Sequence, residues 1–193
     1  IIAAIHRQYL EAGADIINDV SACAPEEGMF ELLAETGCDG VALAQGAMRV
    51  LTGKEDFDNG CIANSCFQVG CNPTRLAISV QMENLTREII ENTGIFNVSV
   101  LTEDVPFETI RHFGMQSGRD VDKFADFVGF ERSENGLIYL TDHTNAMFSC
   151  KVVEKLDLGS HMMFIGEVTE SKKLSGGASC TYAHYHKAIK PKI

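Results

Sequence analysis

Residues 62–82, IANSCFQVGCNPTRLAISVQM, indicate the fold class. Across residues 76–82, apolar side chains alternate with smaller or polar ones, which is the period of two of a strand with one buried face. Residues 62–69 read as a second strand, and Asn72-Pro73 provides a turn between the two. Strands at such short spacing predict antiparallel pairing.

Further strands and short helices surround this pair. The helix predicted over residues 84–92 is closed by Gly94, and Gly159 marks a tight connection between the last two strands. Roughly six strands at short spacing, with helices between them, predict a mainly β protein with helices (β+α), built on an antiparallel barrel. The other predicted strands are 48–52, 96–101, 137–140, 146–153 and 162–168. Residues 106–114 are predicted as a helix, and residues 117–127 as a turn that opens a second short helix.

Composition and charge narrow the classes of function. The chain has 193 residues, of which 45% are hydrophobic and 22% charged, so we expect an ordinary globular core. A net charge of −11 repels nucleic acid backbones and anionic lipids, so we expect neither nucleic acid nor a membrane as a partner. No apolar run approaches the ~20 residues that span a bilayer, and the start does not resemble a secretory signal, which predicts a cytoplasmic protein.

The negative charge is concentrated at the start of the chain. Residues 1–45 carry one basic and eight acidic residues, a net charge of −7. Their apolar runs follow the order helix, strand, helix, strand, which is a βα pattern. We therefore predict an N-terminal helical or βα extension over residues 1–45 and a separate domain over residues 46–193.

The seven cysteines do not form a metal or disulfide pattern. No C-x-x-C pair occurs, so a zinc ribbon or a disulfide framework is not expected. Cys61, Cys66 and Cys71 recur every five residues, and an odd step along a strand changes face. They are interpreted as small buried residues with reduced thiols, and no metal site is predicted.

Residues 117–124, SGRDVDKF, carry the densest chemical pattern. A Ser-Gly turn that opens a helix presents free N–H groups, and Arg119 and Lys123 lie four residues apart on one helix face, which together suit an anion. In the alternative interpretation, Asp120 and Asp122 pair with these bases on a solvated surface.

Other polar residues also allow two readings. Asn64 and Ser65 within an apolar strand either face a ligand or bond the neighbouring backbone. His161 begins a predicted strand, whereas His184 and His186, two residues apart, could chelate a metal if they lay on a strand but lack an accompanying carboxylate motif. No phosphate-loop, dinucleotide-fold or hydrolase motif is present.

Taken in order, these strings resemble the flavin reductase-like family of FMN-binding split barrels, which includes flavoredoxin and the flavin part of high-molecular-weight rubredoxin. The resemblance spans residues 46–187. The chain departs from the family pattern at Pro73-Thr74, where a double proline is usual, and in carrying residues 1–45 before the first barrel strand. Within residues 1–45, residues 12–22 resemble a strand end of dihydropteroate synthases, and residues 35–41 resemble a late strand of TIM-barrel flavoenzymes. Two βα fragments cannot close an eight-stranded barrel. The strings that carry the main resemblance are residues 59–69, 72–73, 75–80, 83–86, 96–101, 117–124 and 159–168.

The resemblance implies a six-stranded antiparallel split barrel, usually a homodimer, that holds FMN at the subunit interface and accepts hydride from NADH or NADPH. Residues near the isoalloxazine and ribityl chain would be Asn64, Ser65, Cys66, Phe67, Gln68, Asn84, Leu85 and Thr86. Residues at the phosphate would be Ser117, Gly118, Arg119 and Lys123. His161, as a catalytic residue, and the pair Tyr185 and His186 would lie near the ring and the nicotinamide.

Two functions share this implied site. In the first, the chain is an NAD(P)H-dependent FMN reductase that passes electrons to free flavin, ferric iron or a small redox protein, such as a rubredoxin-like or flavodiiron protein. In the second, it is an FMN-binding electron-transfer protein, flavoredoxin-like, that a protein partner reduces in place of NAD(P)H. In both, the protein supplies orientation and hydrogen bonds, while the hydride chemistry belongs to the cofactor.

Overall fold

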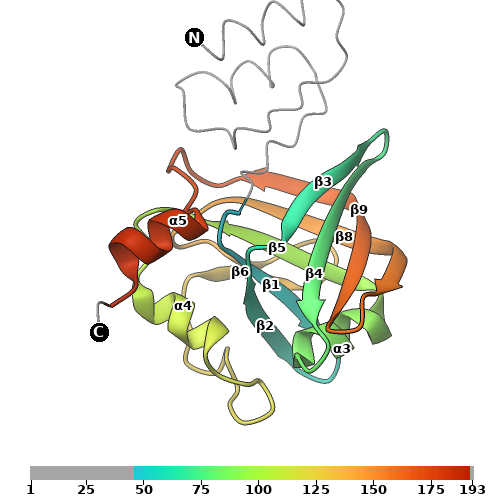
Figure 1. The fold of residues 1–193 in the computed structure, drawn as a ribbon, viewed down its shortest axis with the longest axis horizontal. Coiled ribbons are helices and arrows are strands. Elements are labelled where there is room, and N and C mark those ends of the chain that lie inside the picture. The colour runs from blue at the N-terminus through green and yellow to red at the C-terminus, as the bar shows by residue number, and fades with distance from the viewer. Residues whose placement is uncertain (1–45, 192–193) are drawn as a thin grey trace, which may run out of the picture.

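A seven-stranded antiparallel sheet organises residues 46–191, the part of the chain that the computed structural model describes (Figure 1). The predicted elements of residues 1–45 lie outside the described residues. The strand order is β2-β1-β5-β8-β9-β4-β3. The strands are β1 (Arg49–Lys54), β2 (Asp58–Ala63), β3 (Cys66–Cys71), β4 (Thr74–Gln81), β5 (Ile95–Leu101), β8 (Thr144–Asp157) and β9 (His161–Lys173), with a separate pair β6 (Phe130–Arg132) and β7 (Ile138–Leu140).

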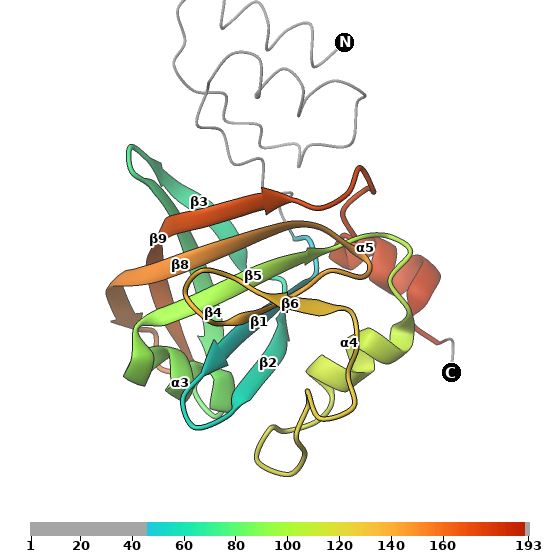
Figure 2. The same cartoon turned by 180° about the vertical axis from the view of Figure 1, so that it is seen from behind.

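The sheet curls into a barrel whose edge strands are β2 and β3, as both views show (Figures 1 and 2). The predicted antiparallel barrel is therefore confirmed, with seven strands in its sheet in place of six. The single strand predicted over residues 62–69 is wrong, because the chain breaks at Asn64 and Ser65. There it leaves β1, the partner of β2, and joins β4, where the Ser79 N–H donates to the Ser65 carbonyl at 3.0 Å.

Two clusters of buried side chains form the core. The first fills the barrel with residues such as Leu76, Ile78 and Phe164. Leu76 and Ile78 are apolar positions of the alternating pattern in β4, so the apolar side of that strand faces the core. The second joins β1 and β7 to helix α4 (Phe107–Gly114) and to the C-terminal π-helix η1 (Tyr185–Ile189). The short turn α5 (Tyr182–His184) precedes η1 and buries none of its residues. No described helix is both long and apolar enough to cross a bilayer.

Helix α3 (Leu85–Thr93) confirms the helix predicted over residues 84–92 and its closure by Gly94. Asn84 is the N-cap, and its side-chain oxygen accepts from the Thr86 N–H at 2.8 Å. Gly94 closes the helix in the left-handed conformation (φ 71°), which a glycine adopts without strain, and its N–H donates to the Ile90 carbonyl.

The helix predicted over residues 117–127 is wrong, because this segment forms turns and bends. Neighbouring side chains of this segment contact different parts of the molecule, and a regular helix would not point them to those partners. Phe124 and Phe127 pack on Phe113 with ring centroids 5.4 and 5.0 Å away, whereas Lys123, just before Phe124, reaches the Gly60 carbonyl of β2. Tertiary packing thus overrides the local helical signal.

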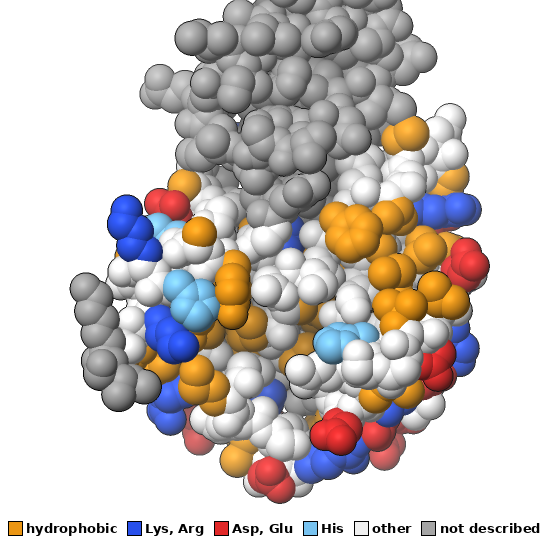
Figure 3. All heavy atoms as spheres, viewed as in Figure 1, with side chains coloured by type: hydrophobic (Ala, Val, Ile, Leu, Met, Phe, Trp, Pro, Cys, Tyr) orange, Lys and Arg blue, Asp and Glu red, His pale blue; other side chains and the backbone are white. Residues whose placement is uncertain are grey.

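One outer face of the barrel is apolar. The register places Phe67, Ala77 and Ile165 in a row across β3, β4 and β9, on the side opposite to the core residues of β4. A second row holds Ser79, Met163 and Leu156, of which Leu156 is 56% exposed. Figure 3 shows apolar side chains gathered over this side of the molecule.

Candidate functional site

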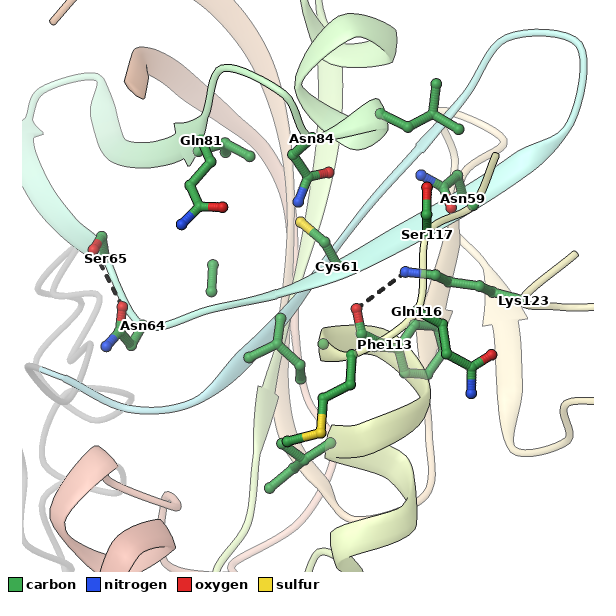
Figure 4. Close-up of a pocket in the computed structure, with 18 of the residues that line it drawn as sticks. Asn59, Cys61, Asn64, Ser65, Gln81, Asn84, Phe113, Gln116, Ser117 and Lys123 are labelled. Carbon is green, nitrogen blue, oxygen red and sulfur yellow. Dashed lines mark hydrogen bonds between the residues drawn. The ribbon is translucent and has the colours of Figure 1, made fainter. Parts of the chain in front are cut away.

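A cleft of about 550 Å³ lies where the two edge strands separate (Figure 4). Its walls come from β2 and the link to β3, the end of β4, the start of α3, the end of α4 and the loop that follows α4. The volume is within the usual range of cofactor sites, which is about 300–1,000 Å³. The outward side chain of Ser79 lines the cleft, so the cleft adjoins the apolar face.

The wall formed by β2 and α3 is held by a chain of hydrogen bonds. The Asn59 amide donates to the Thr86 hydroxyl at 3.0 Å, and Thr86 donates its backbone N–H to the Asn84 side chain. Asn59 is 2% exposed, and within the described chain its Oδ1 atom has no hydrogen-bond partner. Cys61 also lines this wall, and burial raises the pKa of its thiol, which keeps it protonated at neutral pH.

The opposite wall is the irregular loop 115–118 that follows α4. Gly118 lies against Asn59, because a Cβ atom at position 118 would be only 2.1 Å from the Asn59 Oδ1. The Ser117 hydroxyl accepts from the Arg119 N–H at 3.1 Å, which fixes the turn. Glycine is therefore required here for the close approach of the loop to β2.

Lys123 places a buried ammonium group at this end of the cleft. The residue is 3% exposed, and its Nζ donates to the Gly60 carbonyl at 2.8 Å. It also donates to the Phe113 carbonyl at 3.1 Å (Figure 4). Among residues 46–191 no carboxylate pairs with it, and burial lowers the pKa of the Lys123 amine. Because an ammonium has three N–H donors and the two carbonyls occupy two, one remains for an anionic group in the cleft.

Arg119, the other predicted phosphate residue, does not line the cleft. Its side chain is 49% exposed and pairs with the Glu88 carboxylate on α3 at 2.5 Å. Of the two bases in the 117–124 pattern, the structure therefore brings only Lys123 to the cleft.

Of the five residues predicted at the cofactor over 64–68, only the two in the link between β2 and β3 line the cleft. Asn64 and Ser65 line the cleft, and the Ser65 hydroxyl donates to the Asn64 side chain at 3.3 Å (Figure 4). Cys66 turns into the core, Phe67 lies on the apolar outer face, and the Gln68 side chain donates to its own strand at Gly70. These last three lie outside the lining of the cleft.

The remaining predicted residues divide in the same way. Leu85 and Asn84 line the cleft, whereas Thr86 is fully buried behind them. His161 and Tyr185 line it as well, and the His161 ring bonds the Ser160 hydroxyl at 2.9 Å.

His186 lies outside the cleft, edge-on to Tyr182 with ring centroids 4.4 Å apart. The strand considered for His184 and His186 is wrong, because both stand on helical turns.

Several lining residues were not predicted. Asn59 belongs to a string that carries the family resemblance, and Gln81 ends the alternating strand, so both had a sequence signal. Met115 and Gln116 line the cleft from the irregular loop and had none. The full set without a prediction is Met48, Asn59, Cys61, Ile62, Ala63, Ser79, Val80, Gln81, Glu83, Ile110, Phe113, Gly114, Met115 and Gln116.

These features define the class of the protein, which is an antiparallel β-barrel with a polar cleft beside its open edges and a buried ammonium at one end of that cleft. Within that class, the chain belongs to the flavin reductase like domain family, whose match spans residues 41–191.

Relatives and solved structures agree with this assignment. The chain is 41% identical over 144 residues to high molecular weight rubredoxin of Moorella thermoacetica, covering 75% of this chain and 62% of that protein. It is 35% identical over 127 residues to a ferric-chelate reductase (NAD(P)H) of Archaeoglobus fulgidus, covering 66% of this chain and 75% of that protein. The fold matches flavoredoxin from Methanosarcina acetivorans with a TM-score of 0.60 and 22% identity, over 66% of this chain and 68% of that one. The chain thus spans less than two thirds of the Moorella protein.

Proposed function

We propose that the cleft binds FMN with its phosphate at Lys123 and the Ser117-Gly118 turn. The observation that carries this proposal is the buried Lys123 ammonium, which has one free donor and no carboxylate partner among the described residues. Asn64, Ser65 and Asn84 supply amide and hydroxyl groups along the rest of the cleft. This donor set fits a ligand that carries a phosphate, a polyol and a planar ring rich in acceptors.

The proposed activity is that of an NAD(P)H-dependent flavin reductase. When bound, FMN supplies hydride acceptance and electron release, so the protein needs no catalytic acid. His161 and Tyr185 line the cleft and would orient the ring and the nicotinamide of NADH or NADPH. The likeness to a ferric-chelate reductase supports ferric iron as an acceptor, beside free flavin and a small redox protein.

An anaerobic stopped-flow experiment tests this activity. The protein loaded with FMN is mixed with NADH or with NADPH, and the visible flavin absorbance is followed. We expect bleaching within the turnover time with at least one donor. Tight FMN binding without bleaching by either donor would contradict the reductase and support the alternative, an electron-transfer protein reduced by a protein partner.

We also propose a homodimer that pairs through the apolar outer face. Phe67 and Leu156 are exposed there, and the cleft adjoins the face through Ser79. Sedimentation velocity tests this, with a dimer expected and Phe67→Asp expected to yield a monomer.

The five described cysteines are free thiols, which supports the proposed cytoplasmic location.

A further inference from the structure

Positive charge gathers near the C-terminus of an otherwise acidic domain. Residues 171–191 contain the four lysines Lys172, Lys173, Lys187 and Lys190 and no acidic residue. Residues 46–170 contain ten basic and nineteen acidic residues, a net charge of −9. A local field of opposite sign within one domain is a feature that steers a charged partner.

Part of this segment borders the cleft. Tyr185 is buried and lines the cleft, while His186, Lys187 and Lys190 on the same helical turns are exposed. In Figure 3, blue and pale-blue side chains stand on the side of the hollow where Figure 1 places α5. Positive charge thus lies next to the opening through which electrons would leave.

The segment is held in place by the barrel. The Met48 N–H donates to the Cys180 carbonyl at 2.7 Å, and the Cys180 N–H donates to the Leu101 carbonyl at 2.8 Å. Thr181 caps the turn by accepting from the His184 N–H. A surface fixed in this way binds without the entropy cost of ordering a loop.

The two outermost lysines are not neutralised by the domain itself. Glu103 pairs with His184 at 3.3 Å, but within residues 46–191 neither Lys187 nor Lys190 forms an ion pair. Two exposed apolar side chains accompany these charges. Met115, which lines the cleft, is 58% exposed, and Tyr182, which precedes the cleft residue Tyr185 on the C-terminal turns, is 47% exposed. Apolar contacts ringed by charge are the usual anatomy of a transient protein interface.

We propose that the C-terminal turns, Tyr182–Ile189 with Lys190, are the docking surface for a small acidic electron-transfer protein. This inference rests on the proposed flavin site and adds the surface through which it delivers electrons. A protein partner is favoured over the phosphates of a dinucleotide, because Lys187 and Lys190 stand exposed on helical turns and do not line the cleft. Overall, NADH and two oxidised one-electron partners would give NAD⁺, two reduced partners and one proton.

The test uses a rubredoxin chosen for its negative net charge as the probe. The flavin of the loaded protein is reduced photochemically, and the second-order rate of rubredoxin reduction is measured from low to high salt. The test variant is Lys187→Glu/Lys190→Glu. The matched control is Lys54→Glu/Lys151→Glu, which changes the net charge equally at exposed lysines that do not line the cleft. Benzoquinone serves as a neutral acceptor.

We expect the test variant to lower the rubredoxin rate about tenfold or more at low salt, an effect that fades as salt rises. The control variant should change it less than twofold, and the rate with benzoquinone should stay the same in all three proteins. Equal effects of the two variants, or a rate independent of salt, would overturn the docking surface.

Binding of labelled rubredoxin to the protein without flavin, measured by sedimentation, separates the two proposals. If rubredoxin binds in a charge-dependent manner but the protein fails to take up FMN when FMN is added, the result contradicts the flavin site and leaves the docking surface intact. Normal bleaching by NADH together with no rubredoxin binding would contradict the docking surface alone.

Discussion

The two walls of the cleft are built in different ways. The wall of β2 and α3 consists of regular elements joined by hydrogen bonds, in which Asn59, Thr86 and Asn84 follow one another. The wall of residues 115–123 has no repeating structure, and the single Lys123 ammonium and the phenylalanine cluster hold it in place. The first wall is supported by the backbone hydrogen bonds of a strand and a helix, whereas the second lacks that support and depends on a few side-chain contacts, so substitutions in the second should have larger effects.

The largest effect is expected for Lys123→Met. The substitution leaves the Gly60 and Phe113 carbonyls without their donor, at a cost of about 3 kcal/mol, because hydrogen bonds from a charged group contribute roughly 1.5–3 kcal/mol each. FMN affinity should fall by more than 100-fold. Urea unfolding and FMN titration measure the two effects. Unchanged FMN affinity would contradict the phosphate assignment.

Gly118→Ala should come next. The new Cβ atom would collide with the Asn59 side chain, and overpacking of this kind costs about 1–3 kcal/mol. FMN binding should weaken roughly tenfold, since the loop moves away from β2. The double variant Gly118→Ala/Asn59→Ala should recover part of the loss, and simple additivity of the two changes would show that the contact is unimportant.

The pH dependence of FMN binding tests the charge on Lys123. Burial lowers the folded-state pKa of this amine below its ordinary 10.5, so the apo protein gains stability as pH rises through the interval between the two values. The ammonium that we propose as the phosphate contact is lost over the same rise in pH. FMN affinity should therefore decrease several-fold toward pH 10, while riboflavin, which has no phosphate, should show no such loss. Parallel curves for the two ligands would count against the assignment.

Asn84→Ala tests the regular wall. Loss of the N-cap bond to Thr86 should destabilise the protein by about 1 kcal/mol. Asn84→Asp keeps an acceptor at the cap and should unfold at nearly the wild-type urea concentration. A loss equal to that of alanine would show that capping does not explain the effect.

The smallest effect is expected for Arg119→Ala. Arg119 is about half exposed and pairs with Glu88, and exposed ion pairs contribute about 0–1 kcal/mol. FMN affinity should change less than threefold when titrated beside Lys123→Met. A loss comparable to that of Lys123→Met would place Arg119 at the phosphate after all.

Local signals explain which parts were predictable. The alternation of residues 76–82 follows from one strand with a buried side, and the helix over residues 84–92 with its closing Gly94 depends on residues a few positions apart, so both predictions agree with the structure. The break at Asn64 and Ser65 depends on the Ser79 N–H far along the chain. Likewise, the sequence of residues 117–127 does not reveal that Lys123 must reach Gly60, and this distant bond replaces the helix.

Asn84 belongs both to the folding of α3 and to the lining of the cleft. If the cleft holds FMN as proposed, a substitution at Asn84 alters the helix and the ligand site together, so we expect little natural variation at this position. Gln81 and Gln116 line the same cleft, and neither caps a described helix. Divergence among related proteins in the flavin or electron donor they prefer should therefore accumulate at these two glutamines before it reaches Asn84.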